Sequence, residues 1–315
     1  MIISENDWII SNYDVLARKS LTSEKDILIM KKLKILLISS IMMLNMILPV
    51  RAEKTTIYVG QPPGGISDII FRHVAKYEGN TIVVNMPGTL NQHAPRAAFA
   101  NKQPLEVATS TIFVDRLVYG AENTYDIRAN FNEIFIIGNS PTVLIVNTNI
   151  NVSSFDDFRK FIKNSRSPLY AVSSSMTQLA ALELLDRERM KGLSVPYKGG
   201  ANAVISVLSN ETHFYMGNIT GVKGLVEAGK LKIITYEHPS SIRGNHGIAF
   251  PRGMDTQYWR KFMITLCANP HFISDLERFG FQVKPIYGLD FEKWYQSELQ
   301  LYIKLIGKHN DTISR

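Results

Sequence analysis

The segment best suited to bind a charged ligand is the loop Pro62-Pro63-Gly64-Gly65-Ile66-Ser67-Asp68. It lies between a β-rich run, Thr56–Val59, and an amphipathic run that predicts a helix from about Ser67. Two glycines allow a ligand to come close to the backbone, and the free amides at the start of a helix attract an anion. The loop is neither a dinucleotide-binding fingerprint nor a P-loop, because no Gly-Lys-Ser/Thr follows. Such a segment can also be only a turn.

Polar loops recur after other predicted strands. Thr109-Ser110-Thr111 follows a third strand, Ser173-Ser174-Ser175 with Thr177 precedes a predicted helix at 179–190, and Gly217-Asn218 follows a strand that ends at Met216. In open α/β sheets, ligands bind beyond the carboxyl ends of the strands, so these loops are expected to meet at one cleft. The alternative for each loop is that its hydroxyl groups only cap the next helix.

Motifs for catalysis or metal binding are sparse. The sequence has no Gly-x-Ser-x-Gly elbow and no His-Glu-x-x-His, and its seven histidines are dispersed. The single cysteine, Cys267, excludes an intrachain disulfide and a thiolate metal cluster, and its apolar neighbours indicate a buried filler. We therefore predict no catalytic residue, no metal site and no cofactor.

Residues 30–52 have the layout of a cleavable export signal. A basic start, Met30-Lys31-Lys32-Leu33-Lys34, precedes an apolar run at 35–48 and the cleavage pattern Val50-Arg51-Ala52. The apolar run is shorter than the roughly 20 residues that span a bilayer. We predict cleavage after Ala52 and a periplasmic mature protein; an uncleaved anchor or a buried helix is the alternative. Residues 1–29 are interpreted as an over-extended N-terminus.

Composition and pattern predict a large α/β protein. The 315 residues are 45% hydrophobic and 20% charged, which is typical of a folded chain with two lobes rather than one. The net charge is +7, but Lys and Arg are scattered among Asp and Glu, which favours a solvated surface over a nucleic-acid-binding face. Short β-rich runs alternate with helical stretches from Thr55, as in mostly parallel α/β layers. Strands are expected at 134–137 and 143–147, with Gly138-Asn139-Ser140-Pro141 between them and a crossover between the lobes near 138–143.

Five stretches stand in a recognisable order: Ile57-Tyr58-Val59 through Pro63-Gly64-Gly65-Ile66-Ser67-Asp68, Val84-Asn85-Met86-Pro87-Gly88, Ser140-Pro141-Thr142-Val143-Leu144, Val195-Pro196-Tyr197-Lys198-Gly199-Gly200 and Glu227-Ala228-Gly229-Lys230-Leu231. Together they resemble the substrate receptors of tripartite tricarboxylate transporters, also called Bug receptors. The last two stretches are the most specific. The resemblance covers residues 55–236 well and the tail only loosely.

The resemblance implies a Venus-flytrap fold of the periplasmic-binding-protein type, with two crossovers between lobes that are each a mostly parallel sheet flanked by helices. It places the first lobe at 53–140 plus 237–315 and the second at 141–236. It implies a monomeric receptor, not an enzyme, that closes on a small carboxylate and docks onto inner-membrane transporter subunits. The expected ligand contacts are Gly64, Gly65 and Ser67 on one side, opposed by Thr109, Ser110, Ser173, Ser174 and Asn218.

The chain departs from the family in three segments. Thr89-Leu90-Asn91-Gln92-His93 replaces a glycine-rich segment, the serine loop is short, and 237–253 replaces a longer stretch. Two rival interpretations stay open. An enzyme on the same fold would need a titratable pair in the cleft, and an envelope protein could keep the scaffold without a transport ligand.

Overall fold

The computed structural model describes residues 54–88, 91–235, 242–309 and 313, together with Lys32 and Lys34. Lys54–Arg315 form one compact unit, and the fold described below is that of this unit. Apart from the two lysines, the predicted export signal and the residues before it lie outside the described residues. Among the described residues, no helix combines the length and apolar character needed to cross a membrane.

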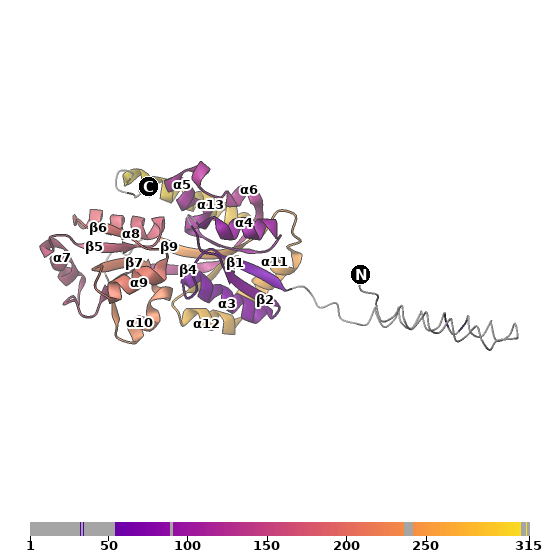
Figure 1. Ribbon diagram of the computed structural model, residues 1–315, viewed down its shortest axis with the longest axis horizontal. Helices are drawn as coiled ribbons and strands as arrows, with labels where there is room; N and C mark the ends of the chain where they lie inside the picture. Colours follow the sequence, from indigo (N-terminus) through magenta and orange to yellow (C-terminus); the bar gives the residue numbers. More distant parts are fainter. Residues whose placement is uncertain are drawn as a thin grey trace, which may run out of the picture. The chain divides into compact units, whose positions relative to one another are not determined.

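The first sheet takes its strands from both ends of the unit (Figure 1). β2, β1 and β3 pair in parallel, and β9, β4 and β10 extend the sheet through antiparallel pairs. The parallel part follows the strand–helix–strand alternation, since a parallel connection needs a crossover helix. The strands are β1 (Thr55–Val59), β2 (Thr81–Asn85), β3 (Leu105–Ala108), β4 (Phe131–Asn147), β9 (Arg243–Pro251) and β10 (Gln282–Ile286).

The second sheet is formed by the middle of the chain. β6, β5 and β7 pair in parallel, and the second part of β4 is antiparallel to both β7 and β8. Its further strands are β5 (Leu169–Val172), β6 (Leu193–Pro196), β7 (Phe214–Asn218) and β8 (Leu231–Ile234). All antiparallel pairs of the described residues involve β4 or β9, so each sheet is mixed. The expected α/β class is confirmed, but the expected predominance of parallel pairing is corrected.

β4 is one continuous strand that belongs to both sheets. It pairs with β9 as far as Pro141 and with β7 from Thr142 onward. Residues 138–141, expected between two separate strands, are thus part of one strand that crosses from the first sheet to the second. Gly138 lies instead at a register shift, where a Cβ atom would stand 2.0 Å from the carbonyl oxygen of Gln282 in β10. Glycine and proline here mark a bulge and a change of partner strand rather than a chain reversal.

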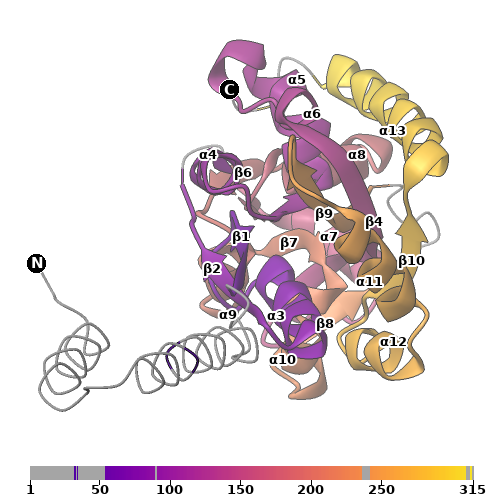
Figure 2. The ribbon, with the colours of Figure 1, turned by 90° about the vertical axis from the view of Figure 1, so that its right-hand side faces the viewer.

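Helices cover both faces of each sheet (Figures 1 and 2). On the first sheet, α3, α11 and α12 pack together on one face, and α4 and α13 pack on the other. On the second sheet, α8 lies on one face, and α9 and α10 lie on the opposite face. The helices are α3 (Ile66–Glu78), α4 (His93–Ala100), α7 (Phe155–Asn164), α8 (Ser175–Arg187), α9 (Gly200–Leu208), α10 (Lys223–Glu227), α11 (Gln257–Cys267), α12 (Pro270–Glu277) and α13 (Gly288–Lys308). Shorter turns are η2 (Ser110–Val114), α5 (Asp115–Tyr119), η3 (Ala121–Asn123), α6 (Ile127–Asn130) and η4 (Ile219–Gly221).

The largest apolar core runs across both sheets, and the C-terminal helix α13 takes part in it. Phe291 and Tyr302 of α13 are buried in this core. The same helix packs against β4 and β10 of the first sheet and against α8 of the second. Lys308 near its end forms an ion pair with Asp186 of α8. α13 is thus a helical connection between the two halves, in addition to β4.

Candidate ligand-binding site

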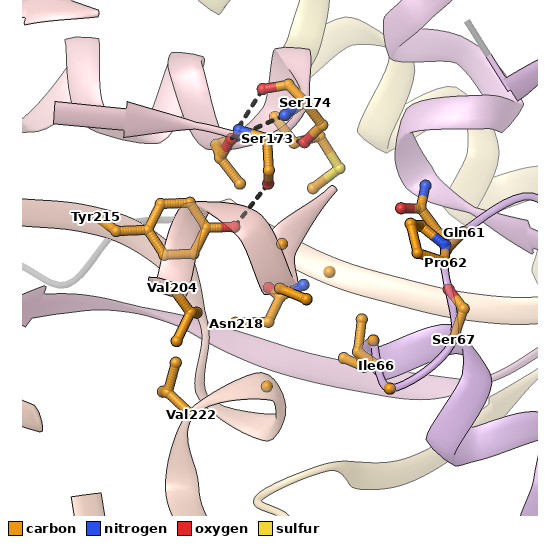
Figure 3. A pocket seen from close by; sticks show the side chains of 18 of the residues that line it. Gln61, Pro62, Ile66, Ser67, Ser173, Ser174, Val204, Tyr215, Asn218 and Val222 are labelled. Carbon is orange, nitrogen blue, oxygen red and sulfur yellow. Dashed lines mark hydrogen bonds between the residues drawn. The ribbon is translucent and has the colours of Figure 1, made fainter. Parts of the chain in front are cut away.

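A cavity of about 280 Å³ lies between the two halves of the unit. Its lining comes from the segments that follow β1, β3, β5 and β7, and from α9, η4, α10 and β9 (Figure 3). Carboxyl ends of strands from both sheets therefore meet at one site, as the recurring polar loops predicted.

Seven of the eight predicted ligand-binding residues line this cavity: Gly64, Gly65, Ser67, Ser110, Ser173, Ser174 and Asn218. Thr109 lies behind the lining. Its side chain is fully buried, and its hydroxyl oxygen accepts hydrogen bonds from the backbone and side-chain amides of Asn245 at 3.2 and 3.1 Å. Thr109 thus holds the start of strand β9 in place behind the site.

The first turn of α3 opens the site on the side of the first sheet. Gly65 is the N-cap residue, and no side chain caps the helix. The amide of Ile69 bonds to the Gly65 carbonyl at 3.0 Å, but the amides of Ile66, Ser67 and Asp68 donate to no acceptor among the described residues. An α-helix leaves its first amides unpaired, and here they lie beside the cavity lined by Ile66 and Ser67.

The two glycines have different roles in shaping this turn. Gly64 has φ of 81°, a left-handed conformation that side-chain-bearing residues rarely adopt. Gly65 has an ordinary φ of −78°, so a side chain at this position would bring no backbone strain. A Cβ atom on Gly65 would stand 3.4 Å from the Pro62 carbonyl oxygen, a contact that the fold can accommodate.

Asp68 fixes the loop from within the helix. Its Oδ2 accepts a hydrogen bond from the Gly64 amide at 3.0 Å and pairs with Arg72 Nε at 2.9 Å. Burial opposes ionisation of Asp68, but these hydrogen bonds outweigh it and hold its pKa below the usual value. Because Arg72 balances this carboxylate, the loop is rigid without a net negative charge at the helix start.

Ser67 belongs to a buried polar cluster with Glu106 and His246. The Ser67 hydroxyl donates to Glu106 Oε1 at 2.8 Å, and His246 Nδ1 lies 3.3 Å from both oxygen atoms. In a catalytic triad the histidine uses its two nitrogens for the nucleophile and the acid separately. Here Nδ1 faces both partners, whereas Nε2 is buried without a hydrogen-bond partner in the described part of the chain. The cluster is a structural support, not a nucleophile–base pair.

The first turn of α8, on the opposite side, is closed by its own side chains (Figure 3). Ser174 Oγ accepts from the Thr177 amide, and Thr177 Oγ1 accepts from the amides of Ser173 and Ser174 at 2.9 and 3.1 Å. The Ser173 hydroxyl bonds to the Tyr215 hydroxyl at 2.6 Å. Burial raises the pKa of Tyr215 to about 12, although the bond with Ser173 favours the phenolate. Ser174 therefore acts as a helix cap, which the sequence offered as the alternative to ligand contact.

A carboxyl group of the protein reaches the start of α8. Ser175, the first residue of the helix, donates its hydroxyl to Asp115 Oδ1 at 2.9 Å. Asp115 comes from α5, in the segment that follows β3, and is almost entirely buried. Burial raises its pKa to about 6, although hydrogen bonds from Ser175 and Asn91 favour the carboxylate. No basic side chain pairs with Asp115 within the residues that the structure describes.

Asn218 lies in the middle of the cavity wall, at the end of β7 (Figure 3). Its side-chain amide has no hydrogen-bond partner in the described ranges, so it is available to a ligand. It packs over Gly244 of β9, where a Cβ atom would stand 2.5 Å from Asn218 Nδ2. Glycine at position 244 therefore leaves the space that Asn218 occupies.

The sequence analysis did not identify Asp115, Glu106 or His246 as residues of the site. One feature of the sequence could have pointed to Glu106: it is a charged residue inside a short apolar strand. The altered segment at 89–93 was expected to rebuild a wall of the cleft; of its described residues, Asn91 bonds to the lining residue Gln61 at 3.3 Å and does not itself line the cavity.

A sequence model of the tripartite tricarboxylate transporter family receptors matches residues 101–241. This range includes β4, the second sheet and the lining residues Ser110, Ser173, Ser174 and Asn218. Over these residues the chain is similar to the receptors of tripartite tricarboxylate transporters. Members of this family are solute-binding receptors, not enzymes. A search of curated proteins finds no match.

Solved structures confirm the two-lobed fold. Rpa4515 of R. palustris, solved with adipate, shares 18% identity at a TM-score of 0.71, covering 82% of this chain and 97% of that one. The periplasmic binding protein BugD shares 16% sequence identity at a TM-score of 0.69, and the alignment covers 82% of this chain and 97% of BugD. MatC from Rhodopseudomonas palustris, with bound malate, shares 15% sequence identity at a TM-score of 0.65, and the alignment covers 84% of this chain and 100% of MatC. At these identities the likeness shows the fold of periplasmic binding proteins alone.

Asp115 should make the stability of this protein depend on pH. Its folded pKa of about 6 lies above the ordinary 3.8, so its stabilising contribution is complete below pH 3.8 and is lost as the pH rises to about 6. That shift corresponds to about 3 kcal/mol. We expect the free energy of unfolding of D115N, relative to the wild type, to rise by this order between pH 4 and pH 7 in urea titrations. E122Q, which alters an exposed carboxyl group, should follow the wild type, and a pH-independent difference for D115N would contradict the assignment.

Proposed function

We propose that this chain is a periplasmic receptor that binds a small carboxylate in the cavity between its lobes and delivers it to the inner-membrane subunits of a tripartite tricarboxylate-type transporter. The observation that carries the proposal is the open first turn of α3 beside the cavity, where three amides lack acceptors. A carboxylate placed there would accept charge-assisted hydrogen bonds, each contributing roughly 1.5–3 kcal/mol. The adipate and malate bound by two structural relatives support a carboxylate as the ligand.

The lobes of this receptor are taken as 53–140 with 237–315, and 141–236. The change of pairing partner in β4 between Pro141 and Thr142 supports the first boundary. The second boundary, at 236–237, lies outside the described residues. α13 contacts elements of both lobes, so the tail contributes to the connection as well as to the first lobe.

Contacts between the lobes around the cavity indicate how a ligand would act. Gly199 lies against Pro62, where a Cβ atom would stand 3.2 Å from the proline ring, and Lys223 Nζ donates to the carbonyl oxygen of Glu277 at 3.3 Å. A ligand that touches α3 on one lobe and Asn218 on the other adds to these contacts only when the lobes are together. Its differential affinity would shift the population toward the closed form, which a membrane partner can recognise. We propose that the receptor does this as a monomer.

Two features support a receptor over a scaffold without a ligand. The cavity is retained at about 280 Å³, and Asn218 presents an unpaired amide to it. An amide that faces a cavity can bind a ligand in place of water, so this group favours retained ligand binding.

Export is the first testable part of the proposal. The basic start, the short apolar run and Val50-Arg51-Ala52 predict that signal peptidase removes everything before Glu53. Intact-mass spectrometry of the protein from a periplasmic extract should give a chain that begins at Glu53. A periplasmic or membrane-bound mass that retains residues 30–52 would refute cleavage at this site.

The open turn of α3 is tested by Gly65→Val. Position 65 has an allowed φ, so the fold should persist, but the added isopropyl group would stand over the amides of α3. Loss of two charge-assisted hydrogen bonds predicts an affinity loss of roughly a hundredfold or more. The measurement is titration calorimetry with the tightest ligand found among acetate, butyrate, hexanoate, malate, adipate and citrate.

The control for this experiment is Gly224→Val. Gly224 lies in α10, has open space around its Cα atom and does not line the cavity. Binding should be unchanged in this variant. Wild-type affinity in Gly65→Val would mean that the carboxylate is held elsewhere.

A further inference from the structure

We propose that His246 takes up a proton at Nε2 when an anion binds at the first turn of α3, so that ligand affinity falls as the pH rises. This inference rests on the proposed function, because it assumes that a carboxylate accepts hydrogen bonds from the amides of that turn. It is carried by three features of the site: a buried acid beside the turn, a histidine on the cavity wall, and a ring nitrogen of that histidine that lacks a partner.

Glu106 places a carboxyl group directly behind the proposed anion site. It lies in β3, is buried, and accepts the hydroxyl hydrogen of Ser67 at 2.8 Å. Ser67 is also one of the three residues whose amides are proposed to bind the carboxylate. No Lys or Arg side chain pairs with Glu106 in the described part of the chain. A ligand anion would therefore be added next to an existing buried carboxylate, and two negative charges in a poorly solvated place repel each other.

The contacts of His246 leave Nε2 as the position for an added proton. Nδ1 lies 3.3 Å from both the Ser67 hydroxyl oxygen and Glu106 Oε1, and the hydroxyl hydrogen is already directed to Glu106. Nδ1 therefore contributes to both contacts as an N–H donor, which in a neutral imidazole leaves the lone pair on Nε2. Nε2 is buried and has no hydrogen-bond partner among the described residues. A proton that moves from solvent to Nε2 converts the ring to an imidazolium paired with Glu106.

The balance between the neutral and the protonated ring depends on the ligand. In the free protein, an added proton would create a buried N–H donor at Nε2 without an acceptor in the described chain, although Glu106 would pair with the opposite side of the ring. An anion on α3 changes this balance, because a second negative charge close to the ring favours its cationic form. Binding and protonation are therefore linked, and each favours the other.

His246 is the one described lining residue that can become a cation near neutral pH. The lining contains no Lys or Arg among the described residues. Its other titratable side chain, Tyr215, stays neutral because burial raises its pKa to about 12. Histidine, in contrast, is the side chain that ordinarily changes charge between about pH 5 and pH 8.

The elements packed against His246 add few other charges. Its register partners on β3 and β4 are an alanine and a glycine, and Phe281 contributes an aromatic ring. On α3, Asp68 is ion-paired with Arg72. On β9 itself, Arg243 lies an odd number of residues away, so it points to the opposite face of the strand. In the described chain, the buried acid of β3 is thus the one charged group bonded to this histidine.

Calorimetry in buffers of different ionisation enthalpy measures the proton directly. The probe is the tightest binder among acetate, butyrate, hexanoate, malate and adipate, titrated at pH 7 in imidazole, bis-Tris and Tris, none of which is an anion. We expect uptake of roughly a third of a proton to one proton for each ligand bound. Because a proton is taken up, affinity should be highest at low pH and should fall roughly tenfold from pH 6.5 to pH 8.5.

The possible failures of this experiment are distinguishable. A carboxylate that binds without proton uptake and with a flat pH profile would overturn this inference and leave the proposed function in place. If none of the carboxylates binds, the proposed function fails and this inference fails with it.

Two variants assign the proton to its group. His246→Gln keeps a side-chain amide beside Ser67 but cannot titrate, so proton uptake and pH dependence should vanish. Glu106→Gln keeps an acceptor for the Ser67 hydroxyl but removes the buried charge, so uptake should fall close to zero and affinity at pH 8.5 should rise roughly tenfold. The control is His73→Gln, at a histidine of α3 that does not line the cavity, and it should keep the wild-type uptake. Uptake that persists in His246→Gln, or that is lost in Asp115→Asn instead, would overturn the assignment.

Nitrogen NMR of the wild type keeps the test independent of the folding of these variants. In protein labelled with ¹⁵N-histidine at pH 7, the same carboxylate should move the Nε2 resonance of His246 from the range of a ring nitrogen with a lone pair toward that of an N–H. An Nε2 resonance that is unchanged at saturating ligand would overturn the inference.

Discussion

The constraint on which the rest of the structure depends is the set of unpaired amides at the first turn of α3. A helix that begins beside a cavity must leave these groups to a side-chain cap, to water or to a ligand. Here Gly65 cannot cap, and the nearby carboxylate of Asp68 is turned back to the Gly64 amide and to Arg72. The left-handed conformation of Gly64 makes this arrangement possible. The polar cluster of Ser67, Glu106 and His246 then holds the helix start against β3 and β9.

The two lobes contribute unequally to the site. Both lobes offer unpaired backbone donors, at the first turn of α3 and at the uncapped first turn of α9. The second lobe adds a capped helix, α8, and the free amide side chain of Asn218. Closure on a ligand therefore depends on hydrogen bonds and shape rather than on ion pairs, because the described cavity lining contains no Lys, Arg, Asp or Glu.

Local features of the sequence predicted most of the elements and the general position of the site. The Pro-Pro-Gly-Gly turn, the serine loop and Gly217-Asn218 all follow strands, and the rule that ligands bind at carboxyl ends placed them together correctly. The same reading could not separate a cap from a ligand contact, because Ser174 satisfies both patterns. Residues whose role depends on distant partners were missed: Glu106 meets His246 across 140 positions, and Asp115 meets Ser175 across 60. The two strands expected at 134–137 and 143–147 proved to be one strand for the same reason, since Gly138 packs against the backbone of β10, which is distant in the sequence.

The most direct test of this account is a crystal structure of the mature protein with its tightest-binding carboxylate. The account predicts that carboxylate oxygens lie at about 2.7–3.2 Å from at least two of the amides of Ile66, Ser67 and Asp68, or reach them through a single ordered water. A carboxylate bound at the first turn of α8, with the α3 amides facing only solvent, would contradict it.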